Sequence, residues 1–270
     1  MSPLTAQLPD IAASRDPRAR LAGLGEVFAL FEEQDSGCRS YGVAVGGERW
    51  FVKLAPGAAN AALLRSAARF HAAVQHPVIL APVAFADADE CAAFLYPWVP
   101  GAVLYHSTKA RHPSRTDPDS PMRAFRAQPL QVVRRVVDDI FDAHLAVAAA
   151  GYVSVDFYDG SMLYDPSTGA VRLIDLDCYR PGPFTVGPQP LPGSRRFLAP
   201  EECTAGAVVD ERTMVFTLGR TALILMDEGD LGQAWRGTQA QLKVLLHATR
   251  PDPAERYESV ARLVAAWRAV

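Results

Sequence analysis

The chain has 270 residues, 49% of them hydrophobic, which is enough for one large domain or two small lobes with a substantial core. Its formal net charge of −3 lacks the basic excess of a nucleic-acid-binding protein, and no apolar run reaches the roughly 20 residues of a membrane helix. Four cysteines without CxxC spacing indicate neither a zinc site nor a disulfide framework, so we expect a cytoplasmic protein with no nucleic-acid or membrane partner.

The N-terminal part of the sequence predicts a small β-rich unit. Residues 1–24 are rich in Pro, Ala and Arg with weak periodicity, and they predict a loosely held leader. Apolar and alternating runs then predict a three-stranded antiparallel meander, a helix and two further strands. The strands are expected at residues 27–31, 40–45, 50–54, 78–84 and 92–96, and the helix at 58–74. Lys53 stands alone among apolar neighbours in the third strand, where it either protects a sheet edge or holds an anion.

The remaining sequence predicts a mainly helical unit. Residues 97–101, Pro-Trp-Val-Pro-Gly, predict a rigid hinge, and residues 106–130 predict an exposed insertion. Apolar residues recur at helical spacing from Val132 to Leu145, and Gly151 suits the C-cap of this long helix. His144 lies on or beside the apolar face and is interpreted as a core histidine. Further helices are expected at residues 215–226, 239–248 and 259–270.

An acidic hairpin is expected in the middle of this unit. Two apolar runs, 161–164 and 170–174, flank a turn that contains Pro and Gly, which is the pattern of a β-hairpin. Asp156 precedes the first strand, and Asp175 and Asp177 follow the second, so the hairpin brings them to one edge. For any one of these residues a surface turn is the commoner role. Together, convergent carboxylates suit a divalent cation or a hydroxyl that must lose a proton.

Several short motifs, in this order, resemble those of the protein kinase superfamily, in particular atypical bacterial serine/threonine kinase-like proteins. Residues 50–53 resemble Val-Ala-Ile-Lys, 76–79 resemble His-Pro-Asn-Ile, 155–157 stand at His-Arg-Asp, 174–177 at Asp-Phe-Gly, and 197–201 contain Ala-Pro-Glu. The resemblance covers residues 26–270. It implies an α+β, two-lobed fold with a β-sheet N-lobe over residues 25–96, a hinge over 97–101 and a larger helical C-lobe over 102–270.

The resemblance also implies roles for individual residues in transferring the γ-phosphoryl group of ATP. Asp156 would orient the acceptor hydroxyl and take its proton, Lys53 would hold the α- and β-phosphates, and Asp175 would bind Mg²⁺ or Mn²⁺. Ser194 would hydrogen-bond Asp156, and Glu201 would form a buried ion pair with Arg256. The remaining implied contacts are Arg39 to phosphate, Tyr96, Trp98 and Val99 to adenine, and Ser161, Asp159 or Asp177 at a second metal position.

The sequence departs from the family pattern at several of these positions. No acidic residue occurs between Lys53 and His76, Ser161 replaces the expected Asn, and Tyr158 replaces the expected Lys. The glycine-rich loop is reduced to residues 36–40, with one glycine. Three interpretations therefore stay open: an active atypical kinase, a pseudokinase that acts as a nucleotide-binding scaffold, or a phosphotransferase for an antibiotic or metabolite. The implied partners are ATP and a hydroxyl-bearing protein or small molecule.

Overall fold

The chain is an α+β protein, as the sequence predicts. The computed structural model describes residues 3–34, 36–88, 90–105, 117, 119–228 and 234–270. It divides into two compact units, which are treated separately below. Unit 1 comprises Met1–Gln75 with Leu80–Pro100, and unit 2 comprises His76–Ile79 with Gly101–Val270. No helix among the described residues combines the length and apolar character that a bilayer crossing requires.

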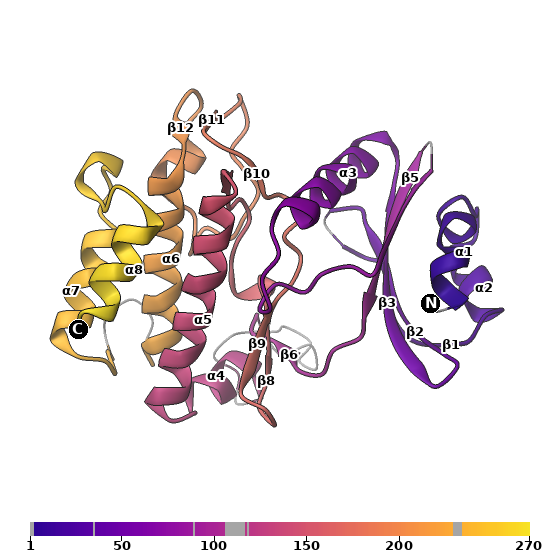
Figure 1. Cartoon of the computed structure of the whole chain (residues 1–270), viewed down its shortest axis with the longest axis horizontal. Coiled ribbons are helices and arrows are strands. Elements are labelled where there is room, and N and C mark those ends of the chain that lie inside the picture. Colours follow the sequence, from indigo (N-terminus) through magenta and orange to yellow (C-terminus); the bar gives the residue numbers. More distant parts are fainter. Residues whose placement is uncertain (1–2, 35, 89, 106–116, 118, 229–233) are drawn as a thin grey trace. The chain divides into compact units, whose positions relative to one another are not determined.

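Unit 1 contains a five-stranded antiparallel sheet with the strand order β1-β2-β3-β5-β4 (Figure 1). Gly46 and Gly47, both with positive φ, close the tight turn between β2 and β3, and the expected three-stranded meander is confirmed. The expected strand at 78–84 is wrong, because β4 begins only at its last residue. The strands are β1 (Glu26–Phe31), β2 (Arg39–Val45), β3 (Glu48–Pro56), β4 (Ala84–Ala88) and β5 (Cys91–Pro97).

Two N-terminal helices cover one face of this sheet. Helices α1 (Pro3–Ala12) and α2 (Pro17–Ala22) form one apolar cluster with the sheet, and the carboxylate of Asp16 caps α2 by accepting from the Ala19 backbone N–H. The expectation of a loosely held leader is therefore wrong for residues 3–22. Leu4, Leu8 and Ile11 recur at helical spacing and are almost fully buried. This short apolar stripe predicts a helix, although the Pro, Ala and Arg content of the segment indicates an irregular leader.

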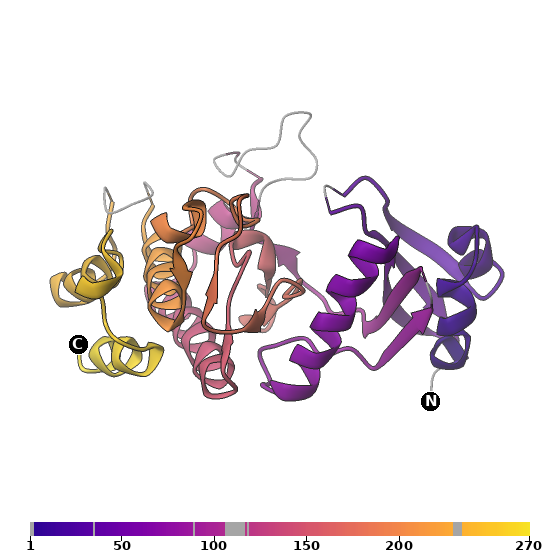
Figure 2. The ribbon, with the colours of Figure 1, turned by 90° about the horizontal axis from the view of Figure 1, so that it is seen from above.

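Helix α3 (Ala58–Ala73) covers the opposite face, as Figure 2 shows for unit 1. Its small and apolar residues Ala61, Leu64 and Ala67 pack with Phe94 of β5. The spacing of three residues along the helix predicts such a buried stripe. Lys53 of β3 belongs to this α3 side, because Phe94 is its direct cross-strand partner.

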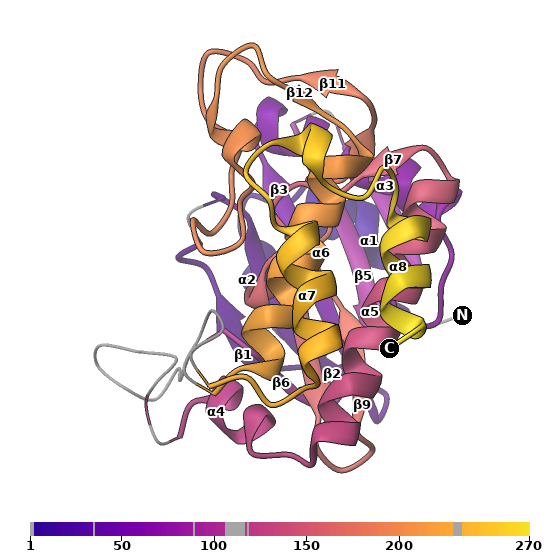
Figure 3. The same cartoon turned by 90° about the vertical axis from the view of Figure 1, so that its left-hand side faces the viewer.

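Unit 2 is built around long helices. Helices α5 (Leu130–Ala149), α6 (Glu211–Met226), α7 (Gln239–Ala248) and α8 (Val260–Arg268) pack on one another, with α7 and α8 over α6 and α5 in Figure 3. The four expected helices are confirmed. Helix α6 begins earlier than residue 215, because Asp210 accepts a hydrogen bond from the Arg212 backbone N–H and caps it.

The predicted insertion is only partly described by the structure. Residues 106–116 and 118 lie outside the described residues. Helix α4 (Pro121–Arg126) buries Met122 and Phe125, so the expectation of an exposed segment is wrong for this stretch.

The acidic hairpin forms as expected. Strands β8 (Met162–Asp165) and β9 (Ala170–Leu173) pair antiparallel, and β6 (Ala102–Val103) adds a third strand. At the turn, Asp165 accepts hydrogen bonds from the Ser167 backbone N–H, the Ser167 hydroxyl and the Thr168 hydroxyl. The remaining elements are short: strands β7 (Tyr152–Val153), β10 (Arg180–Pro181), β11 (Phe184–Thr185) and β12 (Val208–Val209), and 3-10 helices η1 (Asp159–Ser161), η2 (Pro200–Cys203) and η3 (Pro253–Glu255).

Candidate active site

Two aspartates of unit 2 have an unusual backbone conformation. Asp156 follows β7 and has φ 62°, and Asp175 follows β9 and has φ 57°. Among the described residues they are the only non-glycine residues with positive φ. A left-handed backbone costs a non-glycine residue on the order of 1 kcal/mol and is concentrated at functional sites. They are also the two residues for which the sequence predicts a catalytic role, at Asp156, and a metal-binding role, at Asp175.

The loop that carries Asp156 is anchored on both sides. Val155 and Phe157 are buried, and the Phe157 ring lies 4.6 Å from the ring of His144 on α5. The Nδ1 atom of His144 must donate to the Ile140 carbonyl at 2.8 Å, which leaves Nε2 to accept from the Tyr179 hydroxyl at 2.8 Å. His144 is fully buried, and burial lowers its pKa to about 4, so it is the neutral core histidine that we expect.

The loops of Asp156 and Asp175 are joined through Ser161. The Ser161 hydroxyl donates to the Asp156 carbonyl at 3.4 Å, and the Ser161 carbonyl accepts from the Ile174 backbone N–H at 3.0 Å. Ile174 directly precedes Asp175. The residue at the expected Asn position therefore ties the two left-handed aspartates into one local structure, and its hydroxyl is engaged with the backbone.

Tyr158 lies among the acidic side chains of this site. Its pKa is raised to about 12 by burial and by the negative charges of Asp156, Asp175 and Asp159. Gly160 is required beside it, because a Cβ atom there would approach the Tyr158 ring to 2.4 Å. The phenol therefore keeps its proton at neutral pH and offers a hydrogen-bond donor among the carboxylates.

The predicted metal-binding residues lie in different surroundings. Asp159 is fully buried, and its Oδ2 atom accepts from Nη1 of Arg196 at 3.2 Å. Asp177 is buried and Asp175 is exposed. Within the described part of the chain, no group of three or more His, Cys, Asp and Glu side chains is arranged to hold a metal ion. Mg²⁺ is usually bound by only one or two carboxylates together with water and phosphate oxygens, so the oxygen donors of Asp175 and Asp177 fit it.

The segment that begins at Gly193 passes beside Asp156. A Cβ atom at Gly193, which has φ 143°, would approach the Leu198 side chain to 2.7 Å and the Asp156 Cα atom to 3.7 Å. Ser194 follows, and its carbonyl accepts from the Phe197 and Leu198 backbone N–H groups. In the described residues its hydroxyl makes no hydrogen bond to Asp156, so the expected contact is absent even though the segment is adjacent.

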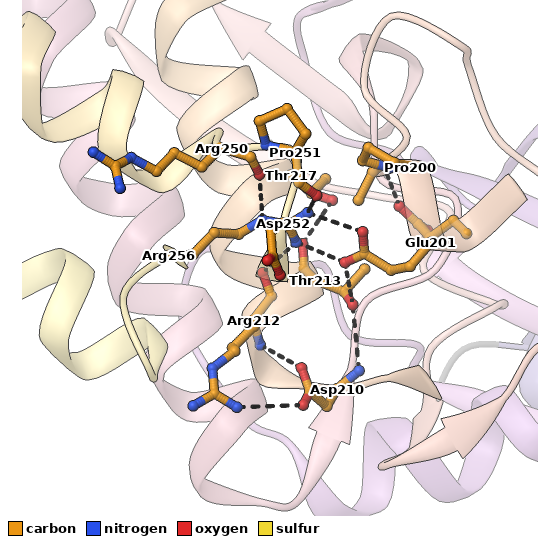
Figure 4. A network of polar contacts seen from close by, with 12 residues as sticks. Pro200, Glu201, Asp210, Arg212, Thr213, Thr217, Arg250, Pro251, Asp252 and Arg256 are labelled. Atoms are coloured by element: carbon orange, nitrogen blue, oxygen red, sulfur yellow. Dashed lines mark hydrogen bonds and ion pairs between the residues drawn. The ribbon is translucent and has the colours of Figure 1, made fainter. Parts of the chain in front are cut away.

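The end of this segment is fixed by a buried ion pair, as Figure 4 shows. Nη1 and Nη2 of Arg256 donate to Oε1 and Oε2 of Glu201 at 2.6 and 2.9 Å, which confirms the expected pair. Arg256 also donates to the carbonyls of Arg250, Arg212 and Pro251, while the Thr213 hydroxyl donates to Glu201. Burial raises the pKa of Glu201, but these hydrogen bonds outweigh it and the net pKa is lowered.

Glu202, the next residue, has the opposite electrostatic environment. It is almost fully buried and accepts one hydrogen bond, from the Ala199 backbone N–H at 2.8 Å. Burial and the nearby charge of Glu201 raise its pKa to about 7. Two adjacent carboxylates therefore differ in protonation near neutral pH because only Glu201 has a guanidinium partner.

The remaining predicted residues belong to unit 1. Lys53 is almost fully buried and lies between Ser40 and Phe94 in the sheet. Strand alternation puts Arg39, which is exposed, on the face opposite to Lys53, so the structure does not bring this expected phosphate contact to the lysine.

Two of the three residues that are expected to contact adenine, Trp98 and Tyr96, contact other residues of unit 1. The Trp98 backbone N–H donates to the Arg49 carbonyl at 2.9 Å, and its ring lies 4.8 Å from that of Phe28. The Tyr96 hydroxyl lies 3.4 Å from Nε2 of His71. Val99, which follows β5, is partly exposed.

Sequence reasoning gave no role to Arg196 or His71. Arg196 appears in the sequence only as part of a short basic pair, and tertiary folding alone brings it to Asp159. His71 had a usable signal, because it continues the buried stripe of Ala61, Leu64 and Ala67 on α3. The sequence matches no protein-family model and no curated protein.

Proposed function

We propose that this chain is an ATP-dependent phosphotransferase, an atypical serine/threonine protein kinase-like enzyme that transfers the γ-phosphoryl group of ATP to a hydroxyl. The observation that carries the proposal is the left-handed backbone of Asp156 and Asp175. Strain that packing holds in place at two acidic residues in adjoining loops is typical of a catalytic site. The motifs at residues 50–53, 155–157, 174–177 and 197–201 support the same reaction class.

In this proposal Asp156 orients the acceptor hydroxyl and accepts its proton as the phosphoryl group is transferred. The anchored loop of Asp156 restricts the motion of this carboxylate, which such positioning requires. Tyr158, a protonated phenol beside Asp156 and Asp175, stands where the family has a lysine. It supplies a neutral hydrogen-bond donor to the transferring phosphoryl group in place of a cation.

Asp175 and Asp177 are the proposed ligands of Mg²⁺ or Mn²⁺. When bound, the cation would offset negative charge on the β- and γ-phosphate oxygens. Ser161 and Asp159 are less suited to this role, because the Ser161 hydroxyl donates to the Asp156 carbonyl and Asp159 pairs with Arg196. In unit 1, Lys53 is the proposed ligand of the α- and β-phosphates.

Turnover of ATP and radiolabel transfer, measured with Mg²⁺ and with Mn²⁺ for the native chain and for Asp156→Asn, test the proposal. We expect label or hydrolysis in the native chain and its loss in Asp156→Asn, with nucleotide affinity nearly retained. Asp175→Asn should instead weaken Mg-ATP binding itself. Equal loss of binding in both variants would contradict the assigned roles.

A second candidate is a pseudokinase that binds nucleotide as a scaffold. It is favoured by the lack of acidic residues on α3 and by the engagement of Ser161 and Asp159 with other groups. Nucleotide that raises the melting temperature of the native chain without any turnover would select this candidate, because a ligand that binds only the folded state stabilises it.

A further inference from the structure

Polar side chains of neighbouring strands lie on the α3 side of the sheet in unit 1. Lys53 of β3 is directly opposite Ser40 of β2 on one side and opposite Phe94 of β5 on the other. Residues directly opposite one another in an antiparallel sheet project from the same face. Because Phe94 packs under α3, Ser40 and Lys53 also face this helix.

Helix α3 brings a histidine to the same place. The His71 ring lies 5.7 Å from that of Phe94 and 6.1 Å from that of Tyr96, so it sits over the same strand as these residues. Burial and, to a smaller extent, the charge of Lys53 lower the pKa of His71 to about 4. The His71 ring is therefore neutral at neutral pH. Helix α3 contains no Asp or Glu, so it places no carboxylate on this face of the sheet.

Two polar atoms beside Lys53 lack hydrogen-bond partners. Ser40 is fully buried, and neither its Oγ atom nor Nδ1 of His71 makes a hydrogen bond with the described residues. Buried polar atoms are almost always paired, and leaving one unpaired costs about 1–3 kcal/mol. The two unpaired atoms lie near the positive charge of Lys53, so a ligand that accepts hydrogen bonds from them is favoured there when it carries negative charge.

We propose that Ser40, Lys53 and His71 form a binding site for a phosphate-type oxyanion within unit 1. The donors are the Ser40 hydroxyl, the Lys53 ammonium and the Nδ1–H of His71, in the tautomer in which the Tyr96 hydroxyl donates to Nε2. This inference rests on the proposed function and deepens it, since it adds Ser40 and His71 to the ligands of the nucleotide phosphate held by Lys53. A free polyphosphate offers the same chemistry as the nucleotide.

Isothermal titration of the full chain with three probes tests the site: sodium tripolyphosphate without metal, Mg-ATP, and adenosine. The variants are Ser40→Ala and His71→Phe, which keeps a ring against Phe94 but removes both nitrogens. His247→Phe is the matched control, because His247 stacks on Tyr257 in unit 2, 4.2 Å between ring centres. We expect Ser40→Ala and His71→Phe each to weaken tripolyphosphate and Mg-ATP binding about tenfold, as the loss of one hydrogen bond to a charged group does.

The outcomes separate this inference from the proposed function. Native-like affinity of Ser40→Ala and His71→Phe for both phosphate probes would overturn the site, even in a chain that transfers phosphate. A native chain that binds neither phosphate probe would also overturn it. Conversely, tripolyphosphate binding that depends on Ser40 and His71, in a chain without turnover, would support the site and reject the transfer reaction. Tripolyphosphate and Mg-ATP both weakened, with adenosine unchanged, would identify the nucleotide phosphates as the ligand.

Melting curves of each variant precede the titrations. If His71→Phe fails to fold, His71→Gln and Ser40→Ala decide the question, because both keep the approximate volume of the native side chain. Loss of phosphate binding in a variant with a native melting temperature is the result that assigns the site.

Discussion

Asp156 adopts a backbone conformation that glycine reaches at lower free energy. Because the left-handed region penalises a Cβ atom and alanine lacks the local hydrogen bonds of Asp or Asn, we expect Asp156→Gly to be more stable than Asp156→Ala by about 1 kcal/mol. Asp156→Asn should match the native stability. Urea unfolding of the three variants measures the differences. A glycine variant less stable than the alanine variant would show that side-chain contacts, not backbone strain, govern this position.

Glu202 provides a test of a buried, poorly paired carboxylate. Its folded-state pKa of about 7 lies above the ordinary carboxylate pKa of 4.5, so its stabilising contribution is present below pH 4.5 and is lost as the pH rises through 7. Glu202→Gln keeps an acceptor for the Ala199 N–H but cannot ionise. We therefore expect it to raise the free energy of unfolding by about 3 kcal/mol at about pH 8.5, and to have little effect at about pH 4.5.

Urea unfolding of the native chain and of Glu202→Gln across this pH range measures the effect. Glu258→Gln is the control, because Glu258 is exposed and forms a surface ion pair with Arg262. A stabilisation that is the same at both ends of the pH range would mean that Glu202 does not titrate as a buried carboxylate.

The segment that ends at Glu201 is held by one ion pair with buried partners on two elements. Arg256 lies just after η3 and the Glu201 carboxylate lies on η2, so each side chain fixes a separate part of unit 2. Removing one partner leaves the other buried and unpaired, and we expect Glu201→Ala or Arg256→Met to lower the free energy of unfolding by about 3–5 kcal/mol. The double variant should lose less than the sum of the two.

The chain offers a matched control for this double-mutant cycle. Arg250 and Glu255 form an exposed pair at 3.9 Å in the same region. Arg250→Ala should cost less than about 1 kcal/mol, because exposed ion pairs contribute little. Urea unfolding measures all four variants. Additive effects of Glu201→Ala and Arg256→Met would contradict a direct energetic coupling.

The elements that the sequence predicts well are those with strong local signals. The turn at Asp165 closes its own hairpin through three hydrogen bonds from Ser167 and Thr168, so the strands on either side are recognisable from sequence alone. Helix α5 has a long apolar stripe with the correct period. The sequence does not predict helix α1, because its apolar stripe contains only a few residues and Pro9 lies inside it.

The same distinction applies to the candidate site. Asp156, Asp175, Glu201 and Arg256 stand in motifs whose order is visible in the sequence. The pairing of Arg196 with Asp159 and the unpaired atoms of Ser40 and His71 arise from packing between distant segments. No local pattern encodes such contacts, so they required the folded structure.

Among the described residues, each unit contains a histidine whose pKa is lowered by burial: His71, which is partly buried, and His144, which is fully buried. His71 in unit 1 and His144 in unit 2 both have folded-state pKa values of about 4, below the ordinary histidine pKa of 6.5. Their stabilising contribution is present above pH 6.5 and is lost as the pH falls, because the unfolded chain binds protons that the folded chain does not. Glu202 acts in the opposite direction over the same range, since the folded state takes up a proton there.

Near pH 5.5 the unfolded chain binds about two more protons at the histidines, and the folded chain binds about one more at Glu202. The unfolded chain therefore binds about one proton more in total, and stability should fall by about 1.4 kcal/mol per pH unit on acidification. Glu202→Gln should make the fall about twice as steep. The double variant His144→Phe/Tyr179→Phe removes one histidine together with its hydrogen-bond partner and should make stability nearly independent of pH. Urea midpoints between about pH 6.5 and 5 measure the slopes. An unchanged slope in the double variant would show that His144 is protonated in the folded chain, contrary to its burial and its hydrogen bond from Tyr179.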